Sequence, residues 1–196
     1  MRGAEAKLSE TTIIGKQAVV KERIAKTYRL VELDDKLRRE RTRSEAKLLH
    51  RAKLAGVACP TVYGVWDFEI VMSRIEGKRP EMDEKECGEA GELLARLHGA
   101  DIIHGDYTPA NLIKGTVDGK ERMHVIDFGL GFVSMDIEDK ATDVFTMLQA
   151  LRGDANDGKD KRRKTAFIDA YRKNFQKSKT VLKRVGDIEK RVRYAF

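Results

Sequence analysis

Along its length the chain changes from an apolar pattern typical of strands to one typical of helices. Near the start, apolar residues alternate with polar ones on either side of Gly15-Lys16, which predicts a twisted hairpin over residues 2–24. Apolar runs on both sides of residues 67–69 predict a second hairpin over residues 60–74. A third hairpin is predicted around Asp118-Gly119, because this dipeptide is a strong turn signal between strands.

Helical spacing of apolar residues dominates the rest of the chain. The first such segment is highly charged and is followed by Gly56, a residue that commonly ends a helix. The predicted helices are residues 34–55, 83–100, 137–152, 165–175 and 180–192. Residues 153–164 are predicted as a polar loop. A chain of 196 residues can bury one core, or two small lobes that share an interface.

Residues 103–111 contain two side chains suited to phosphoryl transfer. Asp106 can orient or deprotonate an attacking hydroxyl, and the Asn111 amide oxygen, five positions on, can hold a metal ion. A second carboxylate, Asp127, follows the apolar pair Val125-Ile126 and can bridge metal ions to phosphates. Mg²⁺ prefers such oxygen ligands. Each aspartate alone fits a turn or a helix cap equally well, but the ordered pair, each behind an apolar run, favours phosphoryl transfer.

The segments His104-Gly105-Asp106 and Asp127-Phe128-Gly129 resemble the catalytic and metal-binding loops of the protein-kinase fold. The first has the form found in small atypical kinases and aminoglycoside phosphotransferases. Over a longer span the chain is similar to the small, RIO-like kinase/ATPase subunit of the archaeal and eukaryotic KEOPS complex, which makes threonylcarbamoyladenosine in tRNA. The stretches that carry this similarity are residues 70–77, 104–111, 127–132 and 138–144. The resemblance extends from Gly3 to the basic C-terminus.

This resemblance implies an α+β fold: a minimal bilobal protein-kinase-like fold with a small β-rich N-lobe and a mostly helical C-lobe. The N-lobe is expected to comprise residues 1–76, with a short antiparallel sheet and a helix. The C-lobe is expected to comprise residues 77–196, with the catalytic loop, the metal loop and basic C-terminal helices. Residues 77–80 would link the two lobes.

The resemblance also implies a site for ATP with Mg²⁺ between the lobes. Lys21 corresponds to the strand lysine that reaches the α- and β-phosphates, and Glu45 to the helix glutamate that holds this lysine in place. From their surroundings alone, Lys21 could equally be a solvated residue, and Glu45 could pair with Arg41 in its own helix. Gly3 is all that remains of a glycine-rich phosphate loop.

The remaining roles follow from the same resemblance. Asp106 is expected to act with Lys21 and Glu45 in catalysis, and Asn111 and Asp127 are expected to bind the metal ions. Met72 would lie at the back of the adenine pocket, and backbone groups of the hinge that follows it would meet the adenine edge. The residues expected to bind the nucleotide are Gly3, Lys21, Met72, Ser73, Ile75, Asn111 and Asp127.

One further residue is expected to support the catalytic loop. Asp143 resembles the helix aspartate that accepts hydrogen bonds from the backbone of that loop, although a solvated helix residue is the alternative. His98 is interpreted as a structural residue, and His104 as a packing and hydrogen-bonding residue. Gly105 takes the place of the arginine with which many kinases sense a phosphorylated activation loop, so regulation by that route is not expected.

The positive charge of the chain is concentrated at its end. The net charge is +7, but residues 159–196 carry +10 and residues 1–158 carry −3. This asymmetry indicates an acidic partner, and the aromatic residues near the basic ones favour nucleic acid. The resemblance implies that this partner is tRNA and that the protein partners are KEOPS-type subunits, notably the tRNA threonylcarbamoyltransferase. The arginines between residues 38 and 43 are either a solvated face or a second anionic contact.

The sequence also bears on where the protein acts. No apolar run approaches the length of a membrane span, and the first residues lack the apolar core of a signal peptide. The two cysteines, Cys59 and Cys87, have no metal-ligand spacing and are interpreted as buried thiols. We therefore expect a cytoplasmic protein without a membrane partner.

Three functions fit these observations. The first is an Mg-ATP-dependent atypical serine/threonine kinase or ATPase within a tRNA-modifying assembly. The second is a small-molecule phosphotransferase of the aminoglycoside or choline kinase type, which Asp127-Phe128-Gly129 and the short chain disfavour. The third is a nucleic-acid-binding scaffold with an inactive kinase fold, which the retention of Lys21, Asp106, Asn111 and Asp127 disfavours. No Ala-Pro-Glu follows Asp127, so the usual platform for a peptide substrate is not expected.

Overall fold

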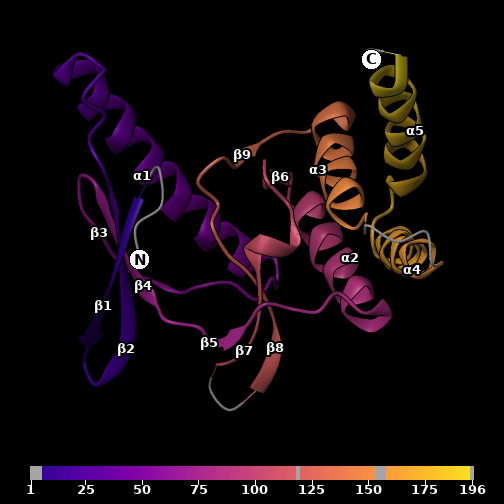
Figure 1. Cartoon of the computed structure of the whole chain (residues 1–196). Helices are drawn as coiled ribbons and strands as arrows, with labels where there is room; N and C mark the ends of the chain where they lie inside the picture. The colour runs from indigo at the N-terminus through magenta and orange to yellow at the C-terminus, as the bar shows by residue number, and fades with distance from the viewer. Residues whose placement is uncertain (1–5, 118–119, 153–157, 195–196) are drawn as a thin grey trace.

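The computed structural model describes residues 6–117, 120–152 and 158–194. Its N-terminal part is a four-stranded antiparallel sheet in the order β1-β2-β4-β3, with the long helix α1 beside it (Figure 1). The elements are β1 (Ala6–Ile13), β2 (Lys16–Arg23), α1 (Val31–Leu54), β3 (Val62–Val65) and β4 (Glu69–Ser73). Both hairpins and the helix predicted for this part are confirmed.

A second antiparallel sheet, in the order β5-β7-β8, follows. Its strands are β5 (Glu76–Lys78), β7 (Leu112–Val117) and β8 (Lys120–Val125). Gly77 and Lys78, predicted as part of a link, pair with Gly115 and Lys114 and so belong to this sheet. A Cβ at Gly77 would lie 2.2 Å from the Lys114 carbonyl oxygen, so the two strands approach more closely than a side chain allows. The predicted Asp118-Gly119 turn lies outside the described residues.

The C-terminal part is mostly helical. Its helices are α2 (Glu84–Gly99), α3 (Ile137–Ala150), α4 (Lys159–Asn174) and α5 (Ser178–Tyr194), and the short strands β6 (Ile102–Ile103) and β9 (Phe132–Val133) pair with each other. The predicted start of α4 at residue 165 is wrong by six residues. The first turns of this helix consist of charged residues, none of which is buried, so they carry no apolar periodicity that could reveal them.

Helix α2 contributes several of its residues to the buried hydrophobic core. Leu94 and Leu97 on this helix are fully buried, and α4 packs directly against it. A Cβ at Gly91 would lie 2.3 Å from the Phe167 carbonyl oxygen, so the glycine permits the close approach of these two helices. Helices α3 and α5 lie side by side in the same part of the molecule (Figure 1). The fold is therefore α+β, and none of the helices within the described ranges could span a membrane.

Candidate functional site

A buried lysine joins strand β2 to helix α1 and to the loop after β8. Lys21 Nζ donates to Glu45 Oε1 at 2.6 Å and to Asp127 Oδ1 at 2.7 Å. Only 8% of Lys21 and 1% of Glu45 are exposed. An ionised pair so far removed from water is retained only with well-aligned partners. The contact expected between Lys21 and Glu45 is therefore present, and Lys21 is not a solvated strand-end residue.

Arg23 is a member of this cluster that the sequence analysis missed. Its Nη2 lies 2.5 Å from Glu45 Oε2, so Glu45 contacts two cations at once. Arg23 is two positions beyond Lys21 in β2, and residues two apart in a strand point to the same face. That spacing is the signal that could have identified Arg23.

Asp127 has an unusual backbone conformation for a residue with a side chain. Its φ is +59°, in the left-handed region that non-glycine residues rarely adopt. Its Oδ1 also accepts from the Gly129 N–H at 3.1 Å. Partial burial opposes ionisation, but the Lys21 ammonium and the hydrogen bonds from Lys21 and Gly129 outweigh it and lower the pKa of the Asp127 carboxyl. Asp127 is thus held as a carboxylate in a strained conformation, a feature that is concentrated at functional sites.

Asp106 and Asn111 are connected within the catalytic loop. The Asn111 amide nitrogen donates to the Asp106 backbone oxygen at 2.8 Å and to Asp106 Oδ2 at 2.9 Å. The short 3-10 helix η1 (Pro109–Asn111), which Pro109 begins, places the two side chains together. Both residues are partly exposed, so their oxygens remain accessible to a ligand.

Two hydrogen bonds hold the catalytic loop against the segment that leads to Asp127. The Ile126 N–H donates to the Asn111 carbonyl oxygen at 3.0 Å, and His104 Nε2 donates to the Ile126 carbonyl oxygen at 3.0 Å. Strands β7 and β8 extend this pairing, with Leu112 opposite Val125. His104 is fully buried, which confirms its interpretation as a packing and hydrogen-bonding residue.

Helix α3 contacts the backbone of the catalytic loop through Asp143. Asp143 Oδ2 accepts from the His104 N–H at 2.6 Å and Asp143 Oδ1 accepts from the Gly105 N–H at 2.9 Å, which confirms the predicted bracing contact. His98 lies 3.4 Å from Asp143 Oδ2 through Nε2 and 2.7 Å from the Tyr171 hydroxyl through Nδ1. Burial lowers the pKa of His98, and Asp143 only partly opposes this effect. His98 is therefore a neutral, structural residue, as predicted.

Gly105 also has a steric reason to be glycine. Its φ is +79°, and a Cβ there would lie 2.4 Å from the Leu130 carbonyl oxygen. The arginine found at this position in many kinases could not be accommodated without moving the loop after Asp127. The close approach of these two loops explains why the His-Gly-Asp form occurs here.

The predicted hinge lies at the end of β4. Met72 is partly buried against the core, and its place at the back of an adenine pocket stays a prediction. However, the Ser73 N–H donates to the Thr61 carbonyl oxygen at 2.8 Å, and the Arg74 N–H donates to the Gln17 carbonyl oxygen at 3.1 Å. These two N–H groups are thus committed within the protein. The role expected of Ile75 stays a prediction, and Gly3 lies outside the described residues.

Two of the predicted metal ligands carry oxygens that suit a hard cation. Asp127, beside Lys21, could supply a carboxylate, and Asn111 could supply an amide oxygen. No group of three or more His, Cys, Asp or Glu residues suited to a metal occurs in the part of the chain that the structure describes. Mg²⁺ commonly binds through one or two protein oxygens together with phosphate and water, so the residues present fit this ion.

The chain matches no protein-family model, but it has clear relatives. It is 39% identical over 193 residues to "Probable serine/threonine-protein kinase BUD32 homolog" of Archaeoglobus fulgidus, covering 97% of this chain and 92% of that protein. It is 41% identical over 187 residues to "Probable bifunctional tRNA threonylcarbamoyladenosine biosynthesis protein" of Methanosarcina acetivorans, covering 92% of this chain. The match spans only 32% of that longer relative.

A solved structure confirms the fold. The Rio2 kinase of Chaetomium thermophilum, determined as an ADP/Mg²⁺-phosphoaspartate complex, superposes with a TM-score of 0.64 at 18% identity. The superposition covers 100% of this chain and 70% of that one. The chain therefore has the fold of this kinase over the span that the two share.

Proposed function

The chain belongs to the family of the BUD32 serine/threonine-protein kinase homologues, and from this premise we propose that it is an Mg-ATP-dependent atypical serine/threonine kinase and ATPase. The observation that carries the proposal is the convergence of Lys21, Glu45 and Asp127, which come from three separate segments of the chain. Lys21 Nζ lies 2.6 Å from Glu45 Oε1 and 2.7 Å from Asp127 Oδ1. If these three residues served only to stabilise the fold, Asp127 would not need to be exposed or to adopt a strained backbone conformation with a positive φ.

Each residue has a distinct task in this proposal. Glu45 holds Lys21, whose ammonium neutralises the charge of the nucleotide phosphates as a compact point charge. Asn111 and Asp127 would hold Mg²⁺, which would supply positive charge to offset the negative charge that develops on the phosphate. Asp106 orients an attacking hydroxyl, either of water or of a serine or threonine side chain, and can accept its proton.

The hydrogen bond between Asn111 and Asp106 gives this assignment a structural basis. The Asn111 amide nitrogen faces Asp106, so the amide oxygen is directed away from that carboxylate. One side chain can thus orient the catalytic carboxylate and still offer an oxygen to a metal ion. The two residues are five positions apart in one segment, and the two hydrogen bonds between them fix their spacing.

We further propose that the chain acts in a KEOPS-type complex, with the tRNA threonylcarbamoyltransferase as its main protein partner. The support is the relative from Methanosarcina acetivorans, in which a segment similar to this chain is part of a longer protein named for tRNA threonylcarbamoyladenosine biosynthesis. A domain joined covalently to others in one relative is often a subunit of a complex in another. The proposed location is the cytoplasm, where tRNA is modified.

The basic C-terminal helices are the proposed contact for tRNA. Val181, Val185 and Ile188 of α5 are buried, so one face of this helix is packed, and Arg184 and Arg191 pair with Glu138 of α3. Among the side chains that the structure describes, the other exposed cations on or just before α5 are Lys177, Lys179, Lys183 and Lys190. We expect these to contact phosphates.

Three aromatic residues of this region are not exposed for stacking on bases. Phe167 and Tyr171 are fully buried and Phe175 is 8% exposed. Binding through α4 and α5 is therefore expected to depend on charge and to show little base preference.

ATP turnover measured with and without tRNA and a tRNA threonylcarbamoyltransferase tests this function. Release of inorganic phosphate and labelling of protein by the γ-phosphate should be followed in parallel, because they separate hydrolysis from transfer. We expect Mg²⁺-dependent turnover that the partner and tRNA stimulate. Phosphorylation of choline or an aminoglycoside in place of these reactions would contradict the proposal, as would a lack of nucleotide binding.

A further inference from the structure

Four large apolar side chains are exposed in the short segment between the metal loop and helix α3. Leu130 is 54%, Phe132 43%, Val133 50% and Met135 70% exposed. Single exposed apolar residues are common on protein surfaces, but several of them within six residues indicate a surface that binds a partner. We call residues 130–135 the apolar segment.

Backbone hydrogen bonds hold the apolar segment in place. The Ser134 N–H donates to the Asp101 carbonyl oxygen at 2.9 Å. Just before it, Phe132 and Val133 form strand β9 and pair with β6 (Figure 1). Adjacent residues of a strand point to opposite faces, so both faces of β9 are exposed. A peptide that binds there meets a surface that is already ordered, which lowers the entropy cost of binding.

Strand β9 also has an open outer edge. Its one strand partner among the described residues is β6. Ser134 lies opposite Asp101 and donates to it, so Val133, the neighbouring residue of this antiparallel pair, directs its N–H and carbonyl away from β6. A strand edge of this kind can bind an extended peptide through backbone hydrogen bonds, while side-chain contacts select the peptide sequence.

The apolar segment borders the catalytic carboxylate. A Cβ at Gly105, the residue before Asp106, would lie 3.2 Å from Leu130 Cβ. Ile103, opposite Phe132 in the β6–β9 pair, precedes Asp106 by three residues, so the backbone between them spans at most roughly 10 Å. An extended peptide covers that distance in about three residues. A peptide paired with β9 can therefore place a hydroxyl at Asp106.

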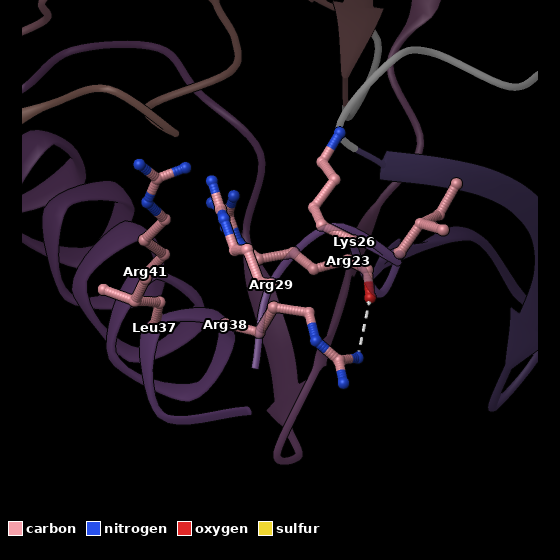
Figure 2. A pocket seen from close by; sticks show the side chains of 7 residues that line it. Arg23, Lys26, Arg29, Leu37, Arg38 and Arg41 are labelled. Atoms are coloured by element: carbon pink, nitrogen blue, oxygen red, sulfur yellow. Dashed lines mark hydrogen bonds between the residues drawn. The ribbon is translucent and has the colours of Figure 1, made fainter. Parts of the chain in front are cut away.

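The basic side chains between the end of β2 and helix α1 do not offer an alternative site for an acidic peptide (Figure 2). Arg23 pairs with Glu45. Arg38 pairs with Asp34 and also donates to the Arg23 carbonyl oxygen at 3.2 Å. Arg29 contacts Asp34 as well. Because these cations are paired within the chain, recognition of a substrate by apolar contact is favoured over recognition by charge.

We propose that the apolar segment binds the protein substrate, an inference that rests on the proposed kinase activity. An extended peptide pairs with the outer edge of β9, and apolar side chains within about three residues of its serine or threonine contact Leu130 and Phe132. In the transfer step the hydroxyl oxygen forms a bond to the γ-phosphorus, and the bond from that phosphorus to the β–γ bridging oxygen breaks, so ADP leaves with the electron pair. Asp106 accepts the hydroxyl proton.

Phosphorylation of two synthetic peptides by the full chain tests this proposal. Each peptide carries one serine, which is flanked on both sides by leucine in the first and by glutamine in the second. We expect the KM of the leucine peptide to be roughly tenfold lower, and Leu130→Gln/Phe132→Gln to raise it to the value of the glutamine peptide. The matched control is Leu30→Gln/Val31→Gln, which alters exposed apolar residues at the start of α1 and should keep the preference.

Val133→Pro tests the strand edge, with Val133→Ala as its control. Proline removes the outward N–H, which alanine keeps, and proline is tolerated at such an edge. The KM of the leucine peptide should be severalfold higher in Val133→Pro than in Val133→Ala, and equal values would contradict pairing with β9. Urea unfolding establishes that both variants are folded.

Binding measured without turnover separates this inference from the proposed function. Fluorescence anisotropy of a labelled leucine peptide with alanine in place of serine gives its affinity for the unaltered chain and the variants. Affinity that depends on Leu130 and Phe132 in a chain without ATP turnover would contradict the kinase activity but not the peptide site. ATP turnover with equal affinity for leucine and glutamine peptides would overturn the peptide site alone.

Two other occupants of the apolar segment would also overturn the proposal. The first is a second copy of the chain, indicated if Leu130→Gln/Phe132→Gln separates a dimer in sedimentation while peptide affinity is unchanged. The second is the tRNA threonylcarbamoyltransferase, indicated if the same variant loses that partner and keeps the peptide. Equal losses of peptide affinity in this variant and in Leu30→Gln/Val31→Gln would likewise overturn it.

Discussion

The carboxylate of Asp143 accepts a hydrogen bond from the His104 backbone N–H at 2.6 Å, and through this contact helix α3 fixes the catalytic loop. The same carboxylate accepts from Gly105 and lies within 3.4 Å of His98, yet only 1% of Asp143 is exposed. One buried side chain thus satisfies donors from two different elements. Asp106, two residues beyond His104, takes its position from this arrangement.

Asp143→Asn should destabilise the protein and misplace the catalytic loop. The asparagine amide has one acceptor oxygen in place of two and directs N–H groups toward backbone N–H donors, so a buried donor loses its partner at a cost of about 1–3 kcal/mol. Urea unfolding measures this loss, and ATP turnover should fall with it. Asp169→Asn, at an exposed position of α4, is the matched control and should change the unfolding free energy by less than about 0.5 kcal/mol. Equal stability of both variants would show that Asp143 does not brace the loop.

His98 should make stability depend on pH. Its pKa is lowered by burial in the folded chain, so between the unfolded value of about 6.5 and the lower folded value the unfolded chain binds more protons. The free energy of unfolding should therefore be highest above that range and should fall as the pH drops from 7 to 5.

His98→Gln removes this titration and should flatten the dependence, although His124, whose pKa is also lowered by burial, retains part of it. His50→Gln is the control, because His50 is exposed. Denaturant unfolding at several pH values gives the slope of the unfolding free energy against pH for the unaltered chain, His98→Gln and His50→Gln. An unchanged slope in His98→Gln would contradict the assignment of His98 as a buried neutral residue.

Neutralising the exposed lysines of α5 should weaken tRNA binding. Deletion of residues 180–196 would remove Val181, Val185 and Ile188 from the core, so substitutions are the cleaner test. In Lys179→Gln/Lys183→Gln/Lys190→Gln the slope of log affinity against log salt should become shallower by about three, or roughly one per phosphate contact. Lys16→Gln/Lys47→Gln/Lys85→Gln removes the same charge from other exposed positions and should leave the slope nearly unchanged. Parallel losses in both variants would show that only net charge matters.

The parts of this structure that could be predicted from the sequence are those that a local pattern or a known motif determines. The hairpins follow from alternation and turn residues, and the contacts of Lys21 with Glu45 and of Asp143 with the catalytic loop follow from motifs shared with kinases. Arg23 was missed because the motif shared with kinases assigns only Lys21 to Glu45, although Arg23 lies two residues beyond Lys21 on the same face of β2. The start of α4 was missed because an exposed helical turn has no apolar periodicity.

Asp106→Asn should separate binding from chemistry. The asparagine retains the size of the side chain and one oxygen for the Asn111 amide, so Mg-ATP affinity should stay within about threefold, because only the basic carboxylate is lost. Turnover should fall by roughly 10²–10⁴-fold, the usual contribution of a general base. Calorimetry and phosphate release measure the two quantities. Lost binding with normal unfolding would contradict the role of Asp106 as a base.

The most direct test of the account is a calorimetric titration of the chain and of Asp127→Ala with Mg-ATP. Asp67→Ala is the matched control, because the side chains of Asp67 and Asp127 are both 52% exposed and both contact a cation. We predict that the unaltered chain and Asp67→Ala bind Mg-ATP with similar affinity, while Asp127→Ala binds at least tenfold more weakly and turns over no ATP. Nucleotide binding and turnover by Asp127→Ala at the level of the control would contradict the central claim that Lys21, Asn111 and Asp127 form one magnesium-nucleotide site.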